Sequence, residues 1–367
     1  MGRIMKTFTV TYHHTHNYGA VLQTYALQRA VESLGHTNTV MEYPYLPKNR
    51  TNLLSGSPGT IIRKLYLRYL GILRKKEMEK LDVHFSDFHR DHLKLSREYK
   101  SMKDLTDNPP DADCLITGSD QVWNLKTLKE FVPARFLAFG DETTRRISYA
   151  ASLESLDYSD KDKEMVANYL KKFDAISLRE QSAKEYIDGF TDAETVRVLD
   201  PVFLLTLEEW RKIAQAPRIE GPYILCYQVQ SNNKMQSLVN ELRQRTGIPV
   251  VSVCNSSIKW IKSDHTYYDV SPQEFIGLYD HAAIVVSASF HGTALGILFG
   301  KPTYGLVKKT RGNRIRELME LFGLDEFCLS EDSSVPEPVY DSERVMRVLE
   351  IEREKSLTFL EDSIGNE

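Results

Sequence analysis

Short apolar runs alternate with longer amphipathic stretches along the whole chain. Strand-like runs occupy residues 7–12, 39–43, 113–117, 147–151, 175–178, 196–199, 223–229, 249–254 and 284–286. Several are apolar and β-branched throughout, as in strands that a parallel sheet buries on both faces. Helical patterns separate successive runs, for example at residues 21–34 and 234–247. We therefore predict an α/β fold with largely parallel sheets and right-handed crossovers.

A chain of 367 residues is long enough for two domains of ordinary size. Pro217, Gly221 and Pro222 interrupt the pattern near the middle. We expect an N-terminal domain over residues 1–216, a C-terminal domain over 217–350 and a C-terminal helix over 351–367. The whole acidic tail, residues 341–367, has the pattern of one long helix.

The most informative stretch is residues 283–314. Its strand, residues 284–286, runs into small and polar residues that include His291, and an apolar helix over 294–299 follows. A basic cluster comes next: Lys308, Lys309, Arg311 and Arg314. Ligands of open α/β sheets bind at the carboxyl ends of strands. A histidine there, with cations close behind, indicates acid/base chemistry on an anion.

Other predicted strands also end in polar residues. Asn17 and Gly19 follow the first, Asp120 follows the strand at 113–117, and Arg179 follows the strand at 175–178. These ends add polar groups to what could be a single crevice. A glycine at a strand-to-helix turn can expose helix amides to a phosphate. No full dinucleotide fingerprint is present, so we do not expect NAD to bind.

Composition and charge exclude several classes of protein. The net charge of −4 argues against a general nucleic-acid binder. Four cysteines occur singly and without CxxC spacing, which favours unpaired thiols over disulfides or zinc. We expect no metal at His13, His14 and His16, because their turn offers no convincing fourth ligand; surface or substrate-facing positions suit them better. Without a long apolar span or signal peptide, we expect a cytoplasmic protein.

Residues 60–80 form a basic amphipathic pattern. Ile62, Leu65, Tyr66, Tyr69, Leu70 and Leu73 fall on one helical stripe, and the basic residues that flank it are Arg63, Lys64, Arg68, Arg74, Lys75 and Lys76. Such a helix can lie on an anionic membrane surface, which would make the protein peripheral to the inner face of the membrane. It can equally pack on its own domain with a solvated basic face.

Together these motifs resemble the polysaccharide pyruvyl transferase family, in order and from residue 7 to about 325. The matching pieces are Asn17-Tyr18-Gly19-Ala20, Leu22-Gln23 and Tyr25-Ala26-Leu27; Thr117-Gly118-Ser119-Asp120-Gln121-Val122-Trp123-Asn124; Ser177-Leu178-Arg179-Glu180; Asp200-Pro201-Val202-Phe203-Leu204-Leu205; and Ser289-Phe290-His291-Gly292-Thr293.

The resemblance implies two Rossmann-like domains facing across a cleft, as in GT-B glycosyltransferases, with the last helix crossing back to the first domain. It places the acceptor on the N-terminal side and the donor on the C-terminal side. The implied reaction moves the pyruvyl group of phosphoenolpyruvate onto two hydroxyls of one sugar, forms a cyclic ketal and releases phosphate. The implied setting is bacterial surface or capsular polysaccharide synthesis, in which the acceptor can be a lipid-pyrophosphate-linked sugar; no cofactor is implied beyond the donor substrate.

One departure concerns the donor. Some relatives carry Arg-Leu-His where this chain has Ser289-Phe290-His291, so other cations must hold the donor anion. We assign acid/base catalysis to His291, with Asp120 as partner carboxylate, although Asp120 could instead cap a helix after Gly118. The expected donor-binding residues are Arg179, Ser289, Phe290, Lys308, Lys309, Arg311 and Arg314. The expected acceptor- or phosphate-binding residues are Asn17, Gly19, Ser119, Gln121, Trp123 and Asn124.

Two other functions fit the same residues. A GT-B nucleotide-sugar glycosyltransferase would need a carboxylate for the ribose hydroxyls, and Glu317 and Glu320 are the candidates. A non-catalytic glycan-binding relative would explain the missing arginine, but it would not need His291, Arg179 and Asp120 together at strand ends. The acceptor sugar, the hydroxyl pair, the ketal stereochemistry and the oligomeric state do not follow from the sequence.

Overall fold

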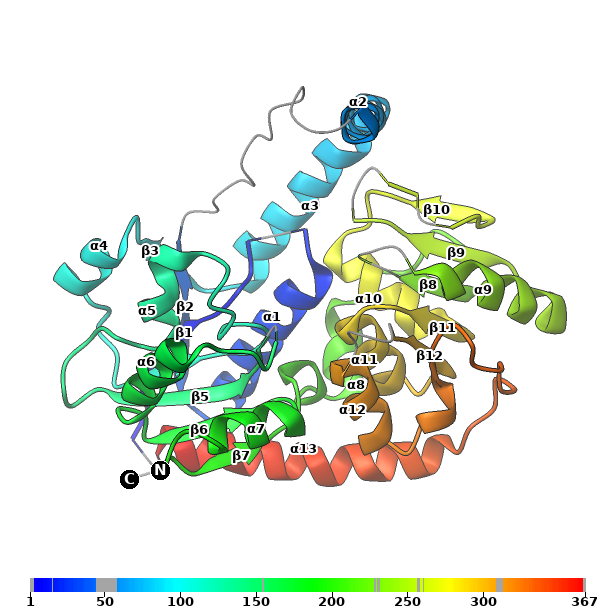
Figure 1. Cartoon of the computed structure of the whole chain (residues 1–367). Helices are drawn as coiled ribbons and strands as arrows, with labels where there is room; N and C mark the ends of the chain where they lie inside the picture. Colours follow the sequence, from blue (N-terminus) through cyan, green and yellow to red (C-terminus); the bar gives the residue numbers. More distant parts are fainter. Residues whose placement is uncertain are drawn as a thin grey trace.

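Two parallel α/β domains lie side by side in the computed structural model (Figure 1). The structure describes residues 3–14, 16–43, 58–153, 155–227, 229, 232–255, 258–259, 261–307 and 313–365, and for residues 58–65 the backbone only. The predicted α/β class and the two-sheet arrangement are confirmed.

The N-terminal sheet has seven strands in the order β3-β2-β1-β4-β5-β6-β7, all parallel. Its strands are β1 (Lys6–Val10), β2 (Thr37–Glu42), β3 (Leu95–Glu98), β4 (Cys114–Thr117), β5 (Arg145–Ala151), β6 (Ala175–Leu178) and β7 (Thr195–Arg197). The helices of this part are α1 (Tyr18–Ser33), α2 (Pro58–Leu73), α3 (Lys75–His92), α4 (Met102–Asp107), α5 (Val132–Arg135), α6 (Asp160–Leu170) and α7 (Gln181–Asp188), with short 3-10 turns η1 (Lys129–Phe131) and η2 (Pro201–Phe203).

The C-terminal sheet has six parallel strands in the order β10-β9-β8-β11-β12-β13. They are β8 (Ile224–Tyr227), β9 (Val250–Val253), β10 (His265–Tyr267), β11 (Ile284–Ser287), β12 (Thr303–Leu306) and β13 (Cys328–Leu329). The helices here are α8 (Leu207–Ile213), α9 (Asn233–Thr246), α10 (Pro272–His281), α11 (Phe290–Leu298), α12 (Asn313–Leu321) and α13 (Ser342–Ile364), with η3 at Asp325–Phe327.

Strand order reverses once in each sheet, between β1 and β4 and between β8 and β11. These reversals are the switch points at which open α/β sheets bind ligands. Asp120 follows β4 and His291 follows β11, so each lies at the carboxyl end of a switch-point strand. The topology therefore positions both residues that the sequence analysis assigned to catalysis.

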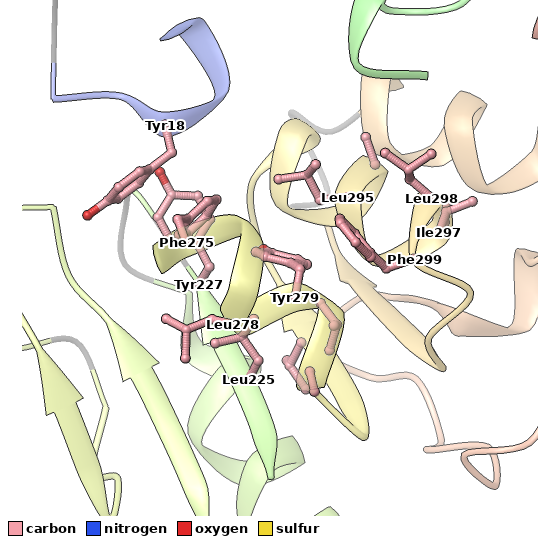
Figure 2. Close-up of a cluster of buried hydrophobic side chains, with 14 of the residues drawn as sticks. Tyr18, Leu225, Tyr227, Phe275, Leu278, Tyr279, Leu295, Ile297, Leu298 and Phe299 are labelled. Atoms are coloured by element: carbon pink, nitrogen blue, oxygen red, sulfur yellow. The ribbon is translucent and has the colours of Figure 1, made fainter. Parts of the chain in front are cut away.

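Helix α1 anchors the N-terminal domain in the core of the C-terminal one. The Tyr18 ring stacks on Phe275 of α10 with ring centroids 4.1 Å apart, and its hydroxyl donates to the Val270 carbonyl at 2.8 Å. Figure 2 shows Tyr18 reaching from α1 into the buried cluster around Phe275 and Tyr227. The Tyr18 ring packs, and its hydroxyl is hydrogen-bonded, across the domain interface. These two contacts fix how the start of α1 faces the second domain.

Helix α13 joins the domains a second time, as predicted. It runs along both of them and returns to the N-terminal domain, so that the two chain ends lie close together (Figure 1). Its first half buries Val345 and Leu349 in the larger core, and its last turns bury Leu360 and Ile364 against α1 and β5. The Ser356 hydroxyl accepts the backbone N–H of Leu199 at 2.9 Å.

Two local expectations need correction. The single helix predicted over residues 60–80 is two helices, because Arg74 leaves helical geometry (φ −104°, ψ 16°) between α2 and α3. Helix α11 begins at Phe290 and not at Ala294, so His291 lies in its first turn. A run of small residues looked like a loop, yet the chain becomes helical directly after β11.

Helix α2 extends away from both sheets at the far end of α3 (Figure 1). Tyr66, Tyr69, Ile72 and Leu73 are each more than half exposed. The alternative that this stretch packs on its own domain is therefore wrong for these residues. In the part of the chain that the structure describes, no helix has the length and apolarity needed to span a membrane.

Candidate active site between the domains

His291 lies against the start of α1 from the opposite domain. A Cβ added to Gly19 would fall 2.3 Å from Cγ and Nδ1 of the His291 ring, closer than any side-chain contact allows. Only glycine permits this approach at the second position of α1. Asn17 caps the same helix, because its Oδ1 accepts the Gly19 N–H at 3.1 Å. Asn17 and Gly19 thus build the surface on which His291 rests.

Asp200 faces the imidazole from the N-terminal domain. Its Oδ2 lies 3.3 Å from His291 Nε2, within ion-pair distance, although the alignment is not that of a hydrogen bond and the described residues offer Nε2 no other partner. The same oxygen accepts Arg179 Nη1 at 2.8 Å and the Ser119 hydroxyl at 3.2 Å. Both Asp200 and His291 are at most a twentieth exposed.

Arg179 contacts three carboxylates, those of Glu180, Asp200 and Asp120. We call these four residues the arginine cluster. Its Nε donates to Glu180 at 2.7 Å, its Nη1 to Asp200 at 2.8 Å, and its Nη2 lies 3.5 Å from Asp120. Ser152 accepts a further hydrogen bond from Nη2 at 3.1 Å. Arg179 also lines the pocket described below, but its buried guanidinium already donates to protein groups, so its role in donor binding stays a prediction.

Neighbouring charges shift the pKa values of Arg179 and Asp200. Burial would lower the pKa of Arg179, but the carboxylates of Glu180, Asp200 and Asp120 outweigh it and raise that pKa. Burial would likewise raise the pKa of Asp200, yet His291 and Arg179 keep it well below its usual range. The ionised Asp200 carboxylate therefore stands at ion-pair distance from the His291 ring.

Phe290 fills the position next to His291. The Arg179 guanidinium lies over its ring at 4.0 Å from the centroid, a cation–π contact in a desolvated place. Ser289 precedes it as the N-cap of α11, and its side chain makes no capping bond. Phe290 therefore supports Arg179, while a direct contact of Phe290 or Ser289 with the donor stays a prediction.

Asp120 and Arg314 define the outer edge of the arginine cluster. Asp120 is in the left-handed region (φ 63°) after β4, and no helix starts there, so the capping alternative is wrong. Its carboxylate lies 3.9 Å from Arg314 Nη1 of α12. The Arg314 side chain is 36% exposed, unlike Arg179, and so has donors available to a ligand.

A pocket of about 230 Å³ opens between the domains beside this cluster. Arg179, Asp200, Phe290 and Arg314 contribute to its wall, whereas His291 lies behind Asp200 and Phe290. The remaining lining residues are Glu180, Gln181, Arg197, Val198, Leu199, Glu317, Leu318, Glu320 and Leu321. Glu317, a candidate for ribose hydroxyls, instead bonds the backbone N–H of Ser182 at 3.1 Å and the Ser182 hydroxyl across the interface.

Of the residues that follow β4, some support the arginine cluster and others belong to the hydrophobic core. Ser119 is fully buried and holds Asp200, so it serves as support. Trp123 is also fully buried, stacks on Phe136, and donates its indole N–H to the Arg135 carbonyl at 3.2 Å. Its assignment to ligand binding is wrong, because its ring belongs to the core.

Asn124 shapes the next turn, where its Oδ1 accepts the Lys126 N–H at 2.9 Å. Gln121 is half-buried one turn before it. Neither residue lines the pocket at the arginine cluster, as far as the described chain shows. Lys308, Lys309 and Arg311 lie outside the described residues, so their predicted role stays a prediction.

Asp200, Glu180 and Ser152 were expected only as polar residues at strand ends that add to a crevice, and no role in the site was assigned to them. Asp200-Pro201 also opens one of the matching motifs. Burial of the histidines at the end of β1 was also unexpected: His13 is fully buried, and His13, His14 and Glu42 bring potential ligand atoms within 4.8 Å of one another.

Two facing parallel α/β domains form a GT-B-like fold, and a buried histidine lies at their junction. The chain belongs to the polysaccharide pyruvyl transferase family, whose model matches residues 17–307. It is therefore a transferase. No curated protein sequence gives a significant match.

Solved structures of low sequence identity are similar to this chain, and the first one below supports the fold. UGT89C1 from Arabidopsis thaliana is 9% identical over 99% of this chain and 100% of that one, with a TM-score of 0.50. UDP-GlcNAc 2-epimerase from Neisseria meningitidis, bound to UDP-GlcNAc, is 13% identical over 99% and 95%, with a TM-score of 0.45. At these identities the similarity concerns the fold alone.

Proposed function

We propose that this protein transfers the pyruvyl group of phosphoenolpyruvate to two hydroxyls of one sugar, forming a cyclic ketal and releasing phosphate. The supporting observation is the position of His291 in a chain of this family. It is buried between the domains, at ion-pair distance from a carboxylate that stays ionised.

The chemistry needs a proton donor near the donor's methylene carbon. Protonated His291 delivers this proton, the CH₂ becomes CH₃, and the adjacent carbon becomes an oxocarbenium-like centre. The first sugar hydroxyl adds to that centre and passes its proton to the imidazole of His291, which has just given up its own. Phosphate then leaves with cleavage of its C–O bond, and the second hydroxyl closes the ring while its proton passes to phosphate or solvent. A positioned acid typically contributes about 10²–10⁴ in rate.

Arg314 is the described cation best placed to meet the donor anion. It lines the pocket, comes from the C-terminal domain and is partly exposed. Asp120, at 3.9 Å from it, is the candidate for an acceptor hydroxyl. Because His291 and Asp200 are almost fully buried, we include in the proposal that the domains separate for substrates to enter, as mobile enzyme clefts do.

We further propose that the protein acts at the inner face of the cytoplasmic membrane, on a lipid-pyrophosphate-linked precursor of a surface or capsular polysaccharide. Helix α2 supports this with an exposed apolar face that includes Tyr66, Tyr69 and Ile72. Arg68 is also exposed, and the Lys75 side chain is 75% exposed. An apolar face with flanking cations binds anionic lipid surfaces.

Calorimetric titration with phosphoenolpyruvate tests the donor without knowledge of the acceptor. We expect saturable binding to the wild type, weakened about 10- to 100-fold in Arg314→Ala, since a hydrogen bond to a charged group contributes about 1.5–3 kcal/mol. Arg316→Ala is the matched control, because Arg316 is an exposed arginine of the same helix. Binding of a UDP-sugar without any phosphoenolpyruvate signal would instead support a nucleotide-sugar glycosyltransferase.

Cosedimentation with vesicles tests the membrane part. The wild type should bind vesicles rich in phosphatidylglycerol, and Tyr69→Ser with Ile72→Ser should reduce partitioning at least about 10-fold, since each buried side chain of this size contributes roughly 1.5–3 kcal/mol. Val339→Ser, at a position 77% exposed elsewhere, is the control. Equal partitioning of the double variant and the wild type would disprove the assignment of α2 to the membrane.

A further inference from the structure

Three potential ligands converge where β1 and β2 end, apart from the arginine cluster. His13 and His14 follow β1, and Glu42 is the last residue of β2. One ligand atom from each lies within 4.8 Å of the others. The histidine turn alone lacked a further ligand, and the parallel pairing of β1 with β2 supplies it from a distant part of the sequence.

The spacing fits a shared metal ion, although His13 Nε2 also lies within hydrogen-bond reach of Glu42 and the Tyr43 N–H reaches His14 Nε2 at 3.5 Å. His13 Nε2 lies 3.4 Å from one carboxylate oxygen of Glu42, and His14 Nε2 lies 3.5 Å from the other. Hydrogen bonds between such atoms are normally about 2.7–3.2 Å long. Two ligands at roughly 2.0–2.1 Å from a tetrahedral zinc ion are about 3.3 Å apart. The observed distances are therefore close to the edge of a coordination tetrahedron.

Burial surrounds this histidine group. His13 is 0% exposed, and its Nδ1 has no hydrogen-bond partner among the described residues. His89 of α3 borders the group, with its ring centroid 5.7 Å from that of His13, and its Nε2 is likewise buried without a described partner. Unpaired buried polar atoms cost free energy.

We propose that His13, His14 and Glu42 bind one divalent transition-metal cation of the zinc class. Two imidazoles and a carboxylate are ligands that zinc accepts, and three protein ligands leave a fourth position for water, another oxygen ligand or His89 after a side-chain rotation. The site ties the β1–α1 loop to β2. That loop leads directly into Asn17 and Gly19, which support His291, so metal binding stabilises the approach to the candidate active site.

The test uses the full-length protein, with any affinity tag removed, after chelation and dialysis. We expect calorimetry with ZnCl₂ to give one ion per chain. Glu42→Gln and His14→Gln should each weaken binding at least about 100-fold, since even residues that only orient metal ligands are typically worth about 10- to 100-fold. His16→Gln is the matched control: it changes a histidine of the same loop whose Nε2 pairs with Asp82 at 2.7 Å, away from the group.

Co²⁺ substitution gives a second readout that folding alone does not produce. The wild type and His16→Gln should show the visible absorption of tetrahedral Co²⁺, and the two ligand variants should lose it while their circular dichroism stays native. Zinc should also raise the melting temperature of the wild type but not that of Glu42→Gln. Absence of stoichiometric binding, or binding that natively folded ligand variants retain, would overturn the proposal.

Discussion

Replacing Gly19 with alanine tests the central packing contact of the candidate site. The added methyl group would lie 2.3 Å from Cγ and Nδ1 and 2.6 Å from Cβ of His291. Ordinary contacts begin near 3.4 Å, so the ring, helix α1 or both have to shift by about 1 Å. Because His291 and Gly19 belong to different domains, the shift acts directly on the domain junction.

The magnitude follows from two opposing effects. Overpacking a filled interior typically costs about 1–3 kcal/mol, whereas alanine in place of glycine gains at most about 1 kcal/mol in a helix. Gly19→Ala should therefore lower the unfolding free energy by up to about 2 kcal/mol. In a His291→Gly background the ring and the Cβ are both absent, so the clash is gone and only the helical gain remains. The coupling energy between the two substitutions should thus be about 1–3 kcal/mol.

Urea denaturation of the wild type, both single variants and the double variant measures this coupling without a substrate. Gly71→Ala is the control, because a Cβ there would meet nothing within 4 Å. Once an acceptor is known, Gly19→Ala should also lose about 10²-fold in kcat/KM, since a misplacement of about 1 Å costs that much. A coupling energy below about 0.5 kcal/mol would refute the contact.

Three further predictions concern the supporting structure. Asp200→Asn removes a buried partner of Arg179 and should lower the urea-unfolding free energy by about 3–5 kcal/mol; an unchanged value would mean that the cluster is not held by charge. Leu360→Ala should cost about 2–5 kcal/mol in the same assay, while Ile351→Ala, at a half-exposed site on the same helix, should be near neutral; equal costs would argue against the docking of α13. Burial raises the pKa of Cys114 to about 12, so only about 10⁻⁴ of this thiol is ionised at pH 8. Peptide mass spectrometry should find Cys114 unmodified by iodoacetamide in the native protein and modified after unfolding, with a native rate that rises as the pH approaches 12; fast native labelling at pH 8 would contradict its burial.

Much of the fold was readable from local pattern. The runs at 113–117, 175–178 and 284–286 correspond to β4, β6 and β11, because a strand buried on both faces is largely apolar. The break in the basic amphipathic stretch was not readable. Nothing in the periodicity around Arg74 signals a helix end, and the direction of α3 is set by its packing.

The sequence identified single residues of the site but not how they are arranged. His291 and Arg179 were identified because each follows a strand, yet their roles depend on neighbours that are distant in sequence. Arg179 looks like a ligand for an anion until the structure places it among Glu180, Asp200 and Asp120. Whether a charged side chain is free to bind a ligand depends on its neighbours in the folded protein.

The sequence by itself determined the parallel α/β class, the family and the edge of each sheet that carries chemistry, because these depend on short-range periodicity and on motifs that follow strands. Only the tertiary structure decided that Gly19 makes room for His291, that Asp200 faces it and that Glu42 joins His13 and His14. Each of these pairs is brought together by sheet order or by the domain interface. Such contacts leave no local trace in a sequence, since the partners are chosen by packing and not by spacing along the chain.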